Sequence, residues 1–253
     1  MEQKMVIISG ASGTLGRAYV EHFSKEDGVR CIALTRRDEP VAGAETIRTD
    51  LLDAEGTAAT IEQFTLENVN EITLIHPVGM FKFEEHGTPE SDSDEDGIDD
   101  EILASNISTL DNLANPLLKK IGDRDIPLTI CAFGSLSDPH NIKYWQSYSK
   151  AKNILRAHMR ELAATSGERV RCVFFSVSTV NTEKERTLRP HADSAYWLTT
   201  DELVTRSLPY LEHPENWKDV EIFRPMPGFT PEYYSDQNAI REKWGREMGR
   251  KLL

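Results

Sequence analysis

An α/β fold with one doubly wound parallel sheet is the architecture that the sequence predicts. Short aliphatic and β-branched runs alternate with longer segments of helical periodicity along the whole sequence. A glycine-rich turn follows the first apolar run, and neither an internal repeat nor a flexible linker interrupts the alternation. Because a strand, a helix and a second strand in this order form a right-handed crossover, we expect the strands to be parallel. Residues 1–253 are therefore predicted to form a single Rossmann-type domain.

The predicted strands are short runs rich in Val, Ile, Leu and Phe, which is typical of strands buried on both faces. They are residues 5–9, 30–35, 45–49, 71–76, 127–133, 169–175 and 220–223. The segments between them have helical spacing of apolar residues, and Asp53 is a suitable N-cap for the second of them. The predicted helices are residues 13–23, 53–64, 96–120, 143–165, 200–211 and 237–251.

The composition indicates a cytoplasmic protein that binds neither nucleic acid nor membrane. A net charge of −13 disfavours attraction to polyanions. No apolar stretch reaches the roughly 18 residues of a membrane span, and the N-terminus lacks the long apolar segment of a secretory signal. Cys31, Cys131 and Cys172 lie in apolar runs without metal-binding spacing, so we expect small buried side chains rather than disulfides or a zinc site.

A glycine-rich turn between the first strand and the first helix is the first candidate binding element. Such a turn lets the backbone approach a pyrophosphate, while the helix N-terminus offers unpaired N–H groups and positive dipole. The alternative is a tight strand-to-helix turn that binds no ligand. The candidate cofactor-binding residues in this turn are Gly10, Ser12, Gly13, Thr14, Leu15 and Gly16.

Arg36 and Arg37 follow the second predicted strand. In a Rossmann fold the end of this strand meets the adenosine ribose, where an acidic residue would bind the free 2′-hydroxyl of NAD. Basic residues at this place favour the 2′-phosphate of NADP, so NADP(H) is the predicted cofactor. The alternative is a pair of solvated surface arginines.

Ser135, Tyr148 and Lys152 form the candidate catalytic set. Tyr148 and Lys152 are four residues apart on a predicted helix, so their side chains share one face. A lysine beside a phenol favours the phenolate and lowers the phenol pKa, which suits a general acid or base. Ser135 ends the fifth predicted strand, at the edge of the sheet where ligands bind in open α/β folds. Its hydroxyl is placed to polarise a carbonyl.

The glycine turn, the strand-end serine and the Tyr-x-x-x-Lys pair together resemble the short-chain dehydrogenase/reductase family over nearly the whole chain. The resemblance implies hydride transfer between a nicotinamide and a carbonyl or alcohol substrate. It makes Tyr148 the general acid or base and Ser135 the group that orients the substrate oxygen. Lys152 is expected to lower the tyrosine pKa and bind the nicotinamide ribose. Asn106, in the preceding long helix, is expected to hold a water that links Lys152 to solvent.

The same resemblance assigns further cofactor contacts and an assembly. Asp50 and Leu51 match the adenine contact, and Val180 and Thr182 match the segment that holds the nicotinamide carboxamide. Residues after the fourth strand complete the cofactor-binding set, and the family implies a homodimer or homotetramer built on its two long helices. The strand-end residues are Pro77, Val78 and Gly79, and the proposed apolar interface residues are Ile107, Leu110, Leu113, Leu155 and Met159. The alternative is that these apolar residues belong to the ordinary core of the domain.

The sequence departs from the family pattern in three places. The turn has Gly-x-x-Gly-x-x-Gly spacing, as in the extended and atypical branches; Pro77-Val78 stands within a segment where Asn-Asn-Ala-Gly is common; and Val177-Ser178 replaces Pro-Gly. Two other functions remain open. A non-catalytic NADP-binding regulator would often lack the tyrosine and lysine that are present here. A sugar-nucleotide epimerase or dehydratase usually needs a larger C-terminal region.

Three further features are interpreted as structural. Residues 92–97 resemble the start of a calcium loop, but its twelfth position is Leu103 instead of a glutamate, so we interpret them as an acidic helix start and expect no metal. Histidines lack metal-binding spacing. The polar residues 183–197 are predicted to be a mobile loop over the substrate, with Arg186 and Arg189 as solvated charges. Trp197 either lines the pocket or anchors the next helix.

Overall fold

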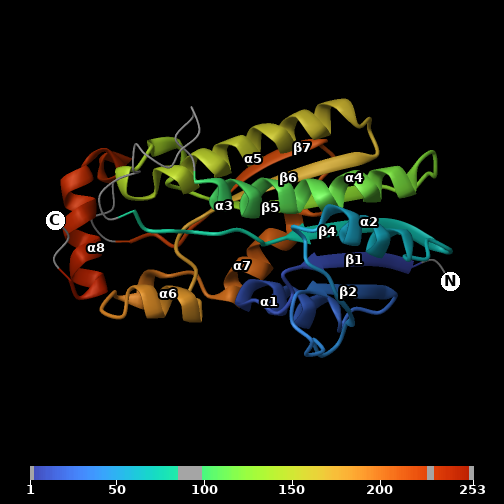
Figure 1. Ribbon diagram of the computed structural model, residues 1–253, viewed down its shortest axis with the longest axis horizontal. Helices are drawn as coiled ribbons and strands as arrows, with labels where there is room; N and C mark the ends of the chain where they lie inside the picture. The colour runs from blue at the N-terminus through green and yellow to red at the C-terminus, as the bar shows by residue number, and fades with distance from the viewer. Residues whose placement is uncertain (1–2, 85–98, 227–230, 251–253) are drawn as a thin grey trace.

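The computed structural model describes residues 3–84, 99–226 and 231–250 of the chain. These residues form a seven-stranded parallel sheet with the order β3-β2-β1-β4-β5-β6-β7, which confirms the predicted doubly wound fold (Figure 1). The order reverses between β1 and β4, and this is the point where open α/β sheets bind their ligands. The strands are β1 Gln3–Ser9, β2 Val29–Thr35, β3 Glu45–Arg48, β4 Val69–His76, β5 Leu128–Ser135, β6 Val170–Val177 and β7 Trp217–Ile222.

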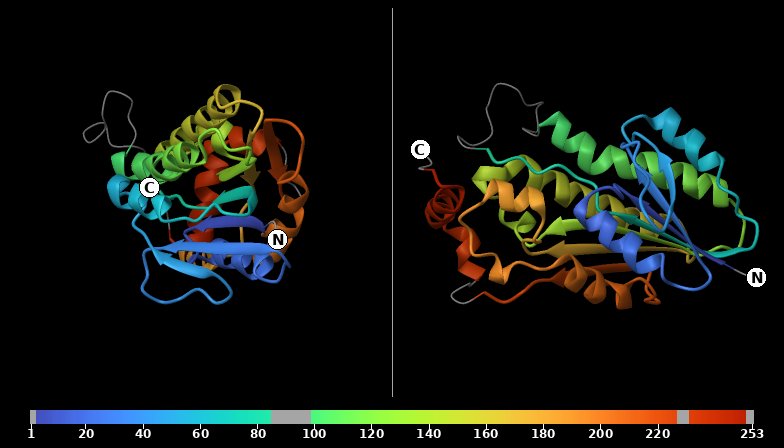
Figure 2. Two further views of the ribbon diagram at one scale, coloured as in Figure 1. Left: turned by 90° about the vertical axis from the view of Figure 1, so that its right-hand side faces the viewer. Right: turned by 90° about the horizontal axis from the view of Figure 1, so that it is seen from below.

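Helices cover both faces of the sheet. One face packs against α2, α4 and α5, and the other packs against α1 and α7 (Figure 2). The short helix α6 and the C-terminal helix α8 lie beyond the carboxyl ends of the strands (Figure 1). The helices are α1 Thr14–Phe23, α2 Ala54–Glu62, α3 Asp100–Leu103, α4 Thr109–Ile121, α5 Gln146–Thr165, α6 Glu183–Leu188, α7 Thr200–Ser207 and α8 Gln237–Met248. Among the described residues, no helix combines the length and the apolar character needed to cross a membrane.

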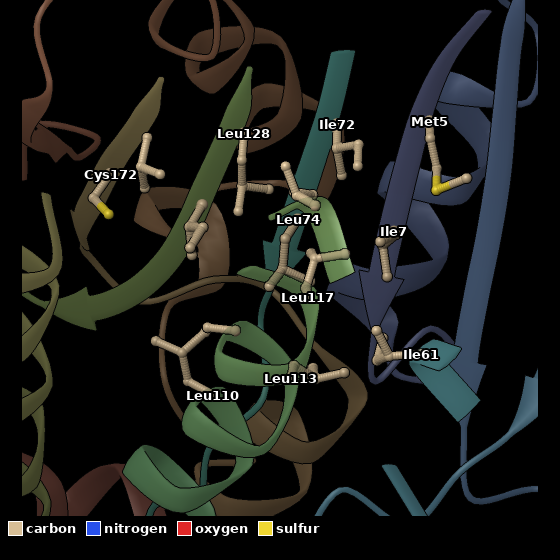
Figure 3. Close-up of a cluster of buried hydrophobic side chains, with 14 of the residues drawn as sticks. Met5, Ile7, Ile61, Ile72, Leu74, Leu110, Leu113, Leu117, Leu128 and Cys172 are labelled. Carbon is tan, nitrogen blue, oxygen red and sulfur yellow. The ribbon is translucent and has the colours of Figure 1, made fainter. Parts of the chain in front are cut away.

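Alternation along each strand divides the core into two layers. Met5 and Ile7 of β1 point into one layer, while Val6 and Ile8 point into the other. The first layer packs strand residues against leucines of α4, as Figure 3 shows. The five inner strands are therefore buried on both faces over most of their length, which is why they read as continuous apolar runs. The edge strands β3 and β7 are partly exposed. The cysteines are unpaired and buried in these layers, as predicted.

The predicted interface residues belong to the core of the single chain. Leu110, Leu113, Leu155 and Met159 are at most 1% exposed and pack against the sheet, and Ile107 packs against the same cluster. The prediction that they form an outward apolar face was wrong. Both long helices are amphipathic, and their apolar stripes pack on the sheet.

The helix predicted over residues 96–120 is interrupted. Asp99 caps α3 by accepting a hydrogen bond from the Ile102 backbone N–H, and a π-helical turn, Ala104–Ser108, separates α3 from α4. Asn106 lies in this turn, and its Nδ2 donates to the Ile102 carbonyl at 2.8 Å and to the Met80 carbonyl at 3.0 Å. A side-chain amide that takes a helical carbonyl displaces the regular backbone pattern. The calcium hypothesis for residues 92–97 lies outside the described residues.

Several other boundaries differ from the predictions. A 3-10 turn, Lys143–Trp145, precedes α5, and another, Leu208–Tyr210, follows α7, so both helices are shorter than predicted. β7 begins earlier than predicted, at Trp217. The segment predicted as a loop over residues 183–197 contains α6, whose N-cap Thr182 accepts a hydrogen bond from the Glu185 N–H.

Candidate active site

A cleft of about 1440 Å³ runs along the carboxyl ends of the strands, from the turn after β1 to α6 and α8. Most of the predicted site residues line it, although they come from six separate segments of the chain. Those that line it are Gly10, Ser12, Gly13, Thr14, Leu15, Gly16, Arg37, Pro77, Gly79, Ser135, Tyr148, Val180 and Thr182. Those outside the lining are Arg36, Asp50, Leu51, Val78, Asn106 and Lys152.

The glycines of the turn leave no room for side chains. Gly10 has a positive φ of 57°, and a Cβ there would lie 2.9 Å from Val78 Cγ2. A Cβ at Gly16 would lie 2.4 Å from the Gly10 carbonyl oxygen, so α1 packs directly on the turn. Gly13 is the N-cap of α1 and provides no side-chain cap for the N–H groups of the first helical turn. The turn thus presents backbone donors to the cleft, as an anion-binding turn requires.

The basic end of the cleft is anchored to the glycine turn. The Thr35 hydroxyl donates to Ser12 Oγ at 2.8 Å and accepts from the Arg37 N–H at 3.1 Å. Arg37 is exposed and lines the cleft, whereas Arg36 is exposed and does not. Arg17 on α1 also lines this end. Sequence reasoning missed Arg17, although its position directly after the last glycine of the turn was a usable signal.

Asp50 and Leu51 stabilise the connection between β3 and α2. Asp50 Oδ1 accepts a hydrogen bond from the Leu52 N–H at 3.1 Å, and the Leu51 carbonyl accepts from Asn112 Nδ2 at 2.8 Å. Leu51 is buried in the core, while Asp50 is exposed. Their role as an adenine contact stays a prediction.

The Ser135 hydroxyl belongs to a chain of hydrogen bonds that sequence reasoning did not include. Ser135 Oγ lies 2.9 Å from Ser137 Oγ and accepts from the Ser137 N–H at 3.2 Å. Trp145 Nε1 donates to Ser137 Oγ at 3.1 Å. Ser137 and Trp145 both line the cleft and are nearly buried. The 3-10 turn before α5 positions the indole, so the contact joins residues on two separate elements.

Asp138 is a fully buried carboxylate directly behind Ser135. Its Oδ2 accepts from the Ser135 N–H at 2.7 Å and lies 3.9 Å from the Arg156 guanidinium. Gly134 leaves space for it, because a Cβ there would lie 2.5 Å from Asp138 Oδ2. Burial raises the pKa of Asp138, and the Ser135 N–H, Lys152 and Arg156 oppose that rise. Asp138 therefore holds the Ser135 backbone, and its charge raises the pKa of Lys152 against the effect of burial.

Tyr148 and Lys152 lie together, but their pKa values differ from the prediction. The Lys152 ammonium lies 5.7 Å from the centre of the Tyr148 ring. Burial raises the pKa of Tyr148 well above its usual value, and the charges of Asp138 and Glu185 add to the rise. Burial also lowers the pKa of Lys152, to about 8, against the opposing effect of Asp138. Lys152 therefore does not lower the phenol pKa in this arrangement, because desolvation of both groups outweighs their interaction.

Asn106 and Lys152 meet at the backbone of Gly79. A Cβ at Gly79 would lie 2.3 Å from Asn106 Oδ1 and 2.9 Å from Lys152 Nζ, so only glycine admits both side chains. Asn106 Oδ1 is buried without a hydrogen-bond partner among the described residues. An orphaned acceptor of this kind is a place where an ordered water commonly binds.

His76 has a structural position at the end of β4. Its Nδ1 lies 2.8 Å from Ser9 Oγ, and its Nε2 lies 3.2 Å from Thr109 Oγ1. The ring is fully buried, which lowers its pKa to about 3 with a contribution from Lys152. His76 therefore joins β1, β4 and α4 as a neutral side chain, and it does not line the cleft.

Arg189 is buried, contrary to its prediction as a solvated charge. It is 4% exposed, donates to Glu185 at 2.6 Å and to Thr179 at 2.9 Å, and pairs with Glu247 at 3.1 Å. Its guanidinium also lies on the ring of Trp197, at 4.9 Å. Trp197 does not line the cleft, so it anchors this segment. A polar stretch of sequence gives no sign that one of its charges is internally paired. Arg186, by contrast, is exposed.

Asp138→Asn is expected to stabilise the protein more at pH 8 than at pH 5. Burial raises the Asp138 pKa from 3.8 to about 7, so the folded state holds this proton more tightly than the unfolded chain. The stability from this proton is fully present below about 4 and is lost as the pH rises through about 7. A neutral amide avoids the loss, with an expected gain of about 1–3 kcal/mol at pH 8.

Urea unfolding of both proteins at the two pH values measures this difference. Asp123→Asn is the matched control, because Asp123 is exposed and its substitution should change stability little at either pH. A gain from Asp138→Asn that is the same at both pH values, or larger at pH 5, would contradict the prediction.

No protein-family model matches the sequence. No curated protein matches it. Solved structures do match: 4-hydroxyisoleucine dehydrogenase complexed with NADH has a TM-score of 0.71 at 19% identity, covering 90% of this chain and 100% of that chain. A protein described as a short-chain dehydrogenase/reductase family protein has a TM-score of 0.71 at 18% identity, covering 87% and 96%. The closed form of serine dehydrogenase complexed with NADP⁺ has a TM-score of 0.71 at 16% identity, covering 89% and 98%. The chain therefore has the fold of these dehydrogenases, as the sequence resemblance predicted.

Proposed function

We propose that the chain is an NADP(H)-dependent oxidoreductase of the short-chain dehydrogenase/reductase type that interconverts a carbonyl compound and an alcohol. The observation that carries the proposal is a single cleft lined by the glycine turn, Ser135 and Tyr148, with Lys152 buried beside the tyrosine ring. Solved structures of the same fold include complexes with NADH and with NADP⁺. The glycine turn and Gly79 form a cradle that added side chains would fill, which fits a dinucleotide lying along the cleft.

Tyr148 is assigned the transfer of a proton to the substrate oxygen. Its raised pKa keeps the phenol neutral, so the side chain carries the proton that a carbonyl oxygen needs during reduction. When bound, the cofactor supplies the hydride, and the protein supplies geometry and charge. Oxidation of an alcohol would need the phenolate, so we expect the reductive direction to be favoured at neutral pH.

Ser135 is assigned the orientation of the substrate oxygen. Ser137 Oγ accepts the Trp145 N–H, and Ser135 Oγ accepts the Ser137 N–H. An indole N–H only donates, so this order favours the Ser137 hydroxyl as donor to Ser135. The Ser135 hydrogen is then directed to the cleft, where it can bond to the substrate oxygen. Ser137 and Trp145 are thus positioning residues for Ser135.

Lys152 and Asn106 are assigned the return of the proton to Tyr148. Lys152, with a pKa lowered to about 8, exchanges protons near neutral pH. Asn106 Oδ1 offers a buried acceptor beside the same glycine, and a water held there would connect the lysine to solvent. Lys152 is also assigned the nicotinamide ribose, because its ammonium lies beside Gly79, which lines the cleft. Val180, Thr182 and Pro77 are assigned to the nicotinamide end, and a cytoplasmic homodimer or homotetramer remains our expectation for the assembled protein.

NADPH is expected to bind more tightly than NADH, because Arg37 and Arg17 line the end of the cleft assigned to the adenosine phosphate. Arg36→Ala combined with Arg37→Ala should erase most of the preference. Arg37→Ala alone should account for most of that effect. It should lower the affinity for NADPH by roughly 10–100-fold, because the hydrogen bonds of a charged group to the phosphate are lost.

Titration calorimetry with both cofactors measures the preference. Arg36→Ala is the matched control, since Arg36 is equally exposed but does not line the cleft. NADH affinity should be unchanged in all three variants. Equal affinities of the unmodified protein for NADPH and NADH would overturn the assignment of NADP.

A further inference from the structure

An aromatic wall closes the end of the cleft next to Tyr148. Phe81 and Phe83 come from the segment after β4, Trp145 precedes α5, and Trp244 and Met248 come from α8. All five line the cleft together with Tyr148, and they form one apolar cluster. Elements far apart in the sequence therefore converge to make this surface.

The rings of the wall pack closely around the phenol. Phe81 meets Tyr148 edge to face, with ring centres 5.2 Å apart, and lies 5.8 Å from Trp244. Trp145 and Trp244 are 4.7 Å apart. The same Trp145 donates a hydrogen bond to Ser137 Oγ, which in turn lies 2.9 Å from Ser135 Oγ. A substrate oxygen that reaches Ser135 and Tyr148 consequently places the rest of its molecule against ring faces and edges.

The buried charge nearest this wall is already paired. The Arg189 guanidinium lies 4.3 Å from the Trp244 ring centre, and Glu185, Glu247 and Thr179 accept its hydrogen bonds. Glu183, Lys184 and Arg250 also line the cleft but are exposed to solvent. Lys152 is the other buried cation at this end, and it is assigned to Tyr148 and the cofactor. Apart from Lys152, a charged substrate held against the aromatic wall would find no unpaired buried charge along the described cleft lining, so the loss of its hydration would be costly.

We propose that the substrate is an apolar carbonyl compound with an aromatic ring next to the carbonyl, such as an aryl ketone or aryl aldehyde. This inference rests on the proposed function and names its substrate class. A ring contact with Phe81, which is half-buried and lines the cleft, stabilises the bound substrate beyond the burial of its area. Trp244 packs behind Phe81, with ring centres 5.8 Å apart, and holds it in place. In the reduction, the carbonyl carbon gains a hydride from NADPH and its oxygen gains the Tyr148 proton. NADPH becomes NADP⁺, and Tyr148 regains a proton from solvent.

Binding is measured separately from turnover so that the two proposals can fail separately. The protein is saturated with NADP⁺, and acetophenone, dihydroxyacetone and pyruvate are titrated by calorimetry. NADPH oxidation is followed with the same three ketones. Acetophenone should bind at least about tenfold more tightly than either polar ketone. Phe81→Leu should lower the affinity for acetophenone by about tenfold, because the ligand loses an aromatic partner. Trp244→Leu is the second variant, and Trp217→Phe on β7, outside the cleft lining, should leave acetophenone binding unchanged.

The outcomes separate the two claims. Tighter binding or faster reduction of dihydroxyacetone or pyruvate than of acetophenone would overturn the aromatic substrate class and leave the oxidoreductase proposal standing. Acetophenone binding that neither Phe81→Leu nor Trp244→Leu weakens would overturn the assignment of this wall. Failure of the protein to bind NADP⁺ or NADPH would overturn the proposed function and this inference with it.

Discussion

Tyr148→Phe is expected to lower the rate of carbonyl reduction by about 10²–10⁴-fold, which is the usual contribution of a positioned general acid. Phenylalanine keeps the ring and its edge-to-face contact with Phe81, so the aromatic wall should stay in place. The substitution removes the proton that we assign to the substrate oxygen. NADPH affinity should be nearly unchanged, and stopped-flow measurement of NADPH oxidation together with calorimetry tests both expectations.

Tyr144→Phe is the matched control for this variant. Tyr144 lies in the 3-10 turn that precedes α5, and its ring stacks on that of Phe83 with ring centres 5.8 Å apart. It does not line the cleft. Removing its hydroxyl should leave the rate of NADPH oxidation within about twofold, because no general-acid role is assigned to it. If Tyr148→Phe retained near-full activity on a confirmed substrate, Tyr148 would act only by packing and the mechanism would be wrong.

Lys152→Ala is expected to reduce turnover as strongly as Tyr148→Phe and also to weaken NADPH binding. The two effects follow from the two roles that we assign to Lys152, the return of protons to Tyr148 and a cofactor contact beside Gly79. A loss of about tenfold or more in NADPH affinity corresponds to one bond between a charged group and a hydroxyl. The contrast with Tyr148→Phe, which should retain NADPH binding, separates the two residues.

Steady-state rates and NADPH titrations of both variants measure that contrast. Lys150→Ala, two residues before Lys152 on α5, controls for a general loss of positive charge and should change neither quantity appreciably, because Lys150 does not line the cleft. Full NADPH affinity in Lys152→Ala would contradict the ribose contact. Full turnover would contradict the proton-return role.

The fold could be predicted from the sequence because its five inner strands are buried on both faces over most of their length. A strand such as β6, Val170–Val177, has no polar face, and its apolar run stands out between two helical segments. The Tyr148–Lys152 spacing was equally readable, since a helix fixes which residues share a face. The π-helical turn at Asn106 was not readable, because it depends on a hydrogen bond to Met80 from a different segment.

The residues that sequence reasoning missed act through contacts between elements. Trp145 bonds to Ser137 across a turn, and Asp138 is buried by the packing of α5 and β7 around Arg156. The prediction that the Tyr148 pKa is lowered was wrong because burial raises this pKa, and the spacing of two residues on a helix does not show how deeply they are buried. The acidic Asp138, three residues after Ser135, was a local signal that the sequence did contain, as was Arg17 directly after the glycine turn.

Transfer of deuterium from NADPH to a carbonyl carbon tests the oxidoreductase proposal most directly. The protein is incubated with an aryl aldehyde panel and a polar ketone panel, using NADPH labelled at nicotinamide C4 with deuterium on one face or on the other. An alcohol that carries deuterium from one labelled form and none from the other is the expected result, and Tyr148→Phe should slow its formation by about 10²–10⁴-fold. Tight NADPH binding with no deuterium in any alcohol, from either form, would contradict the proposal and favour a non-catalytic NADP-binding protein of the same fold.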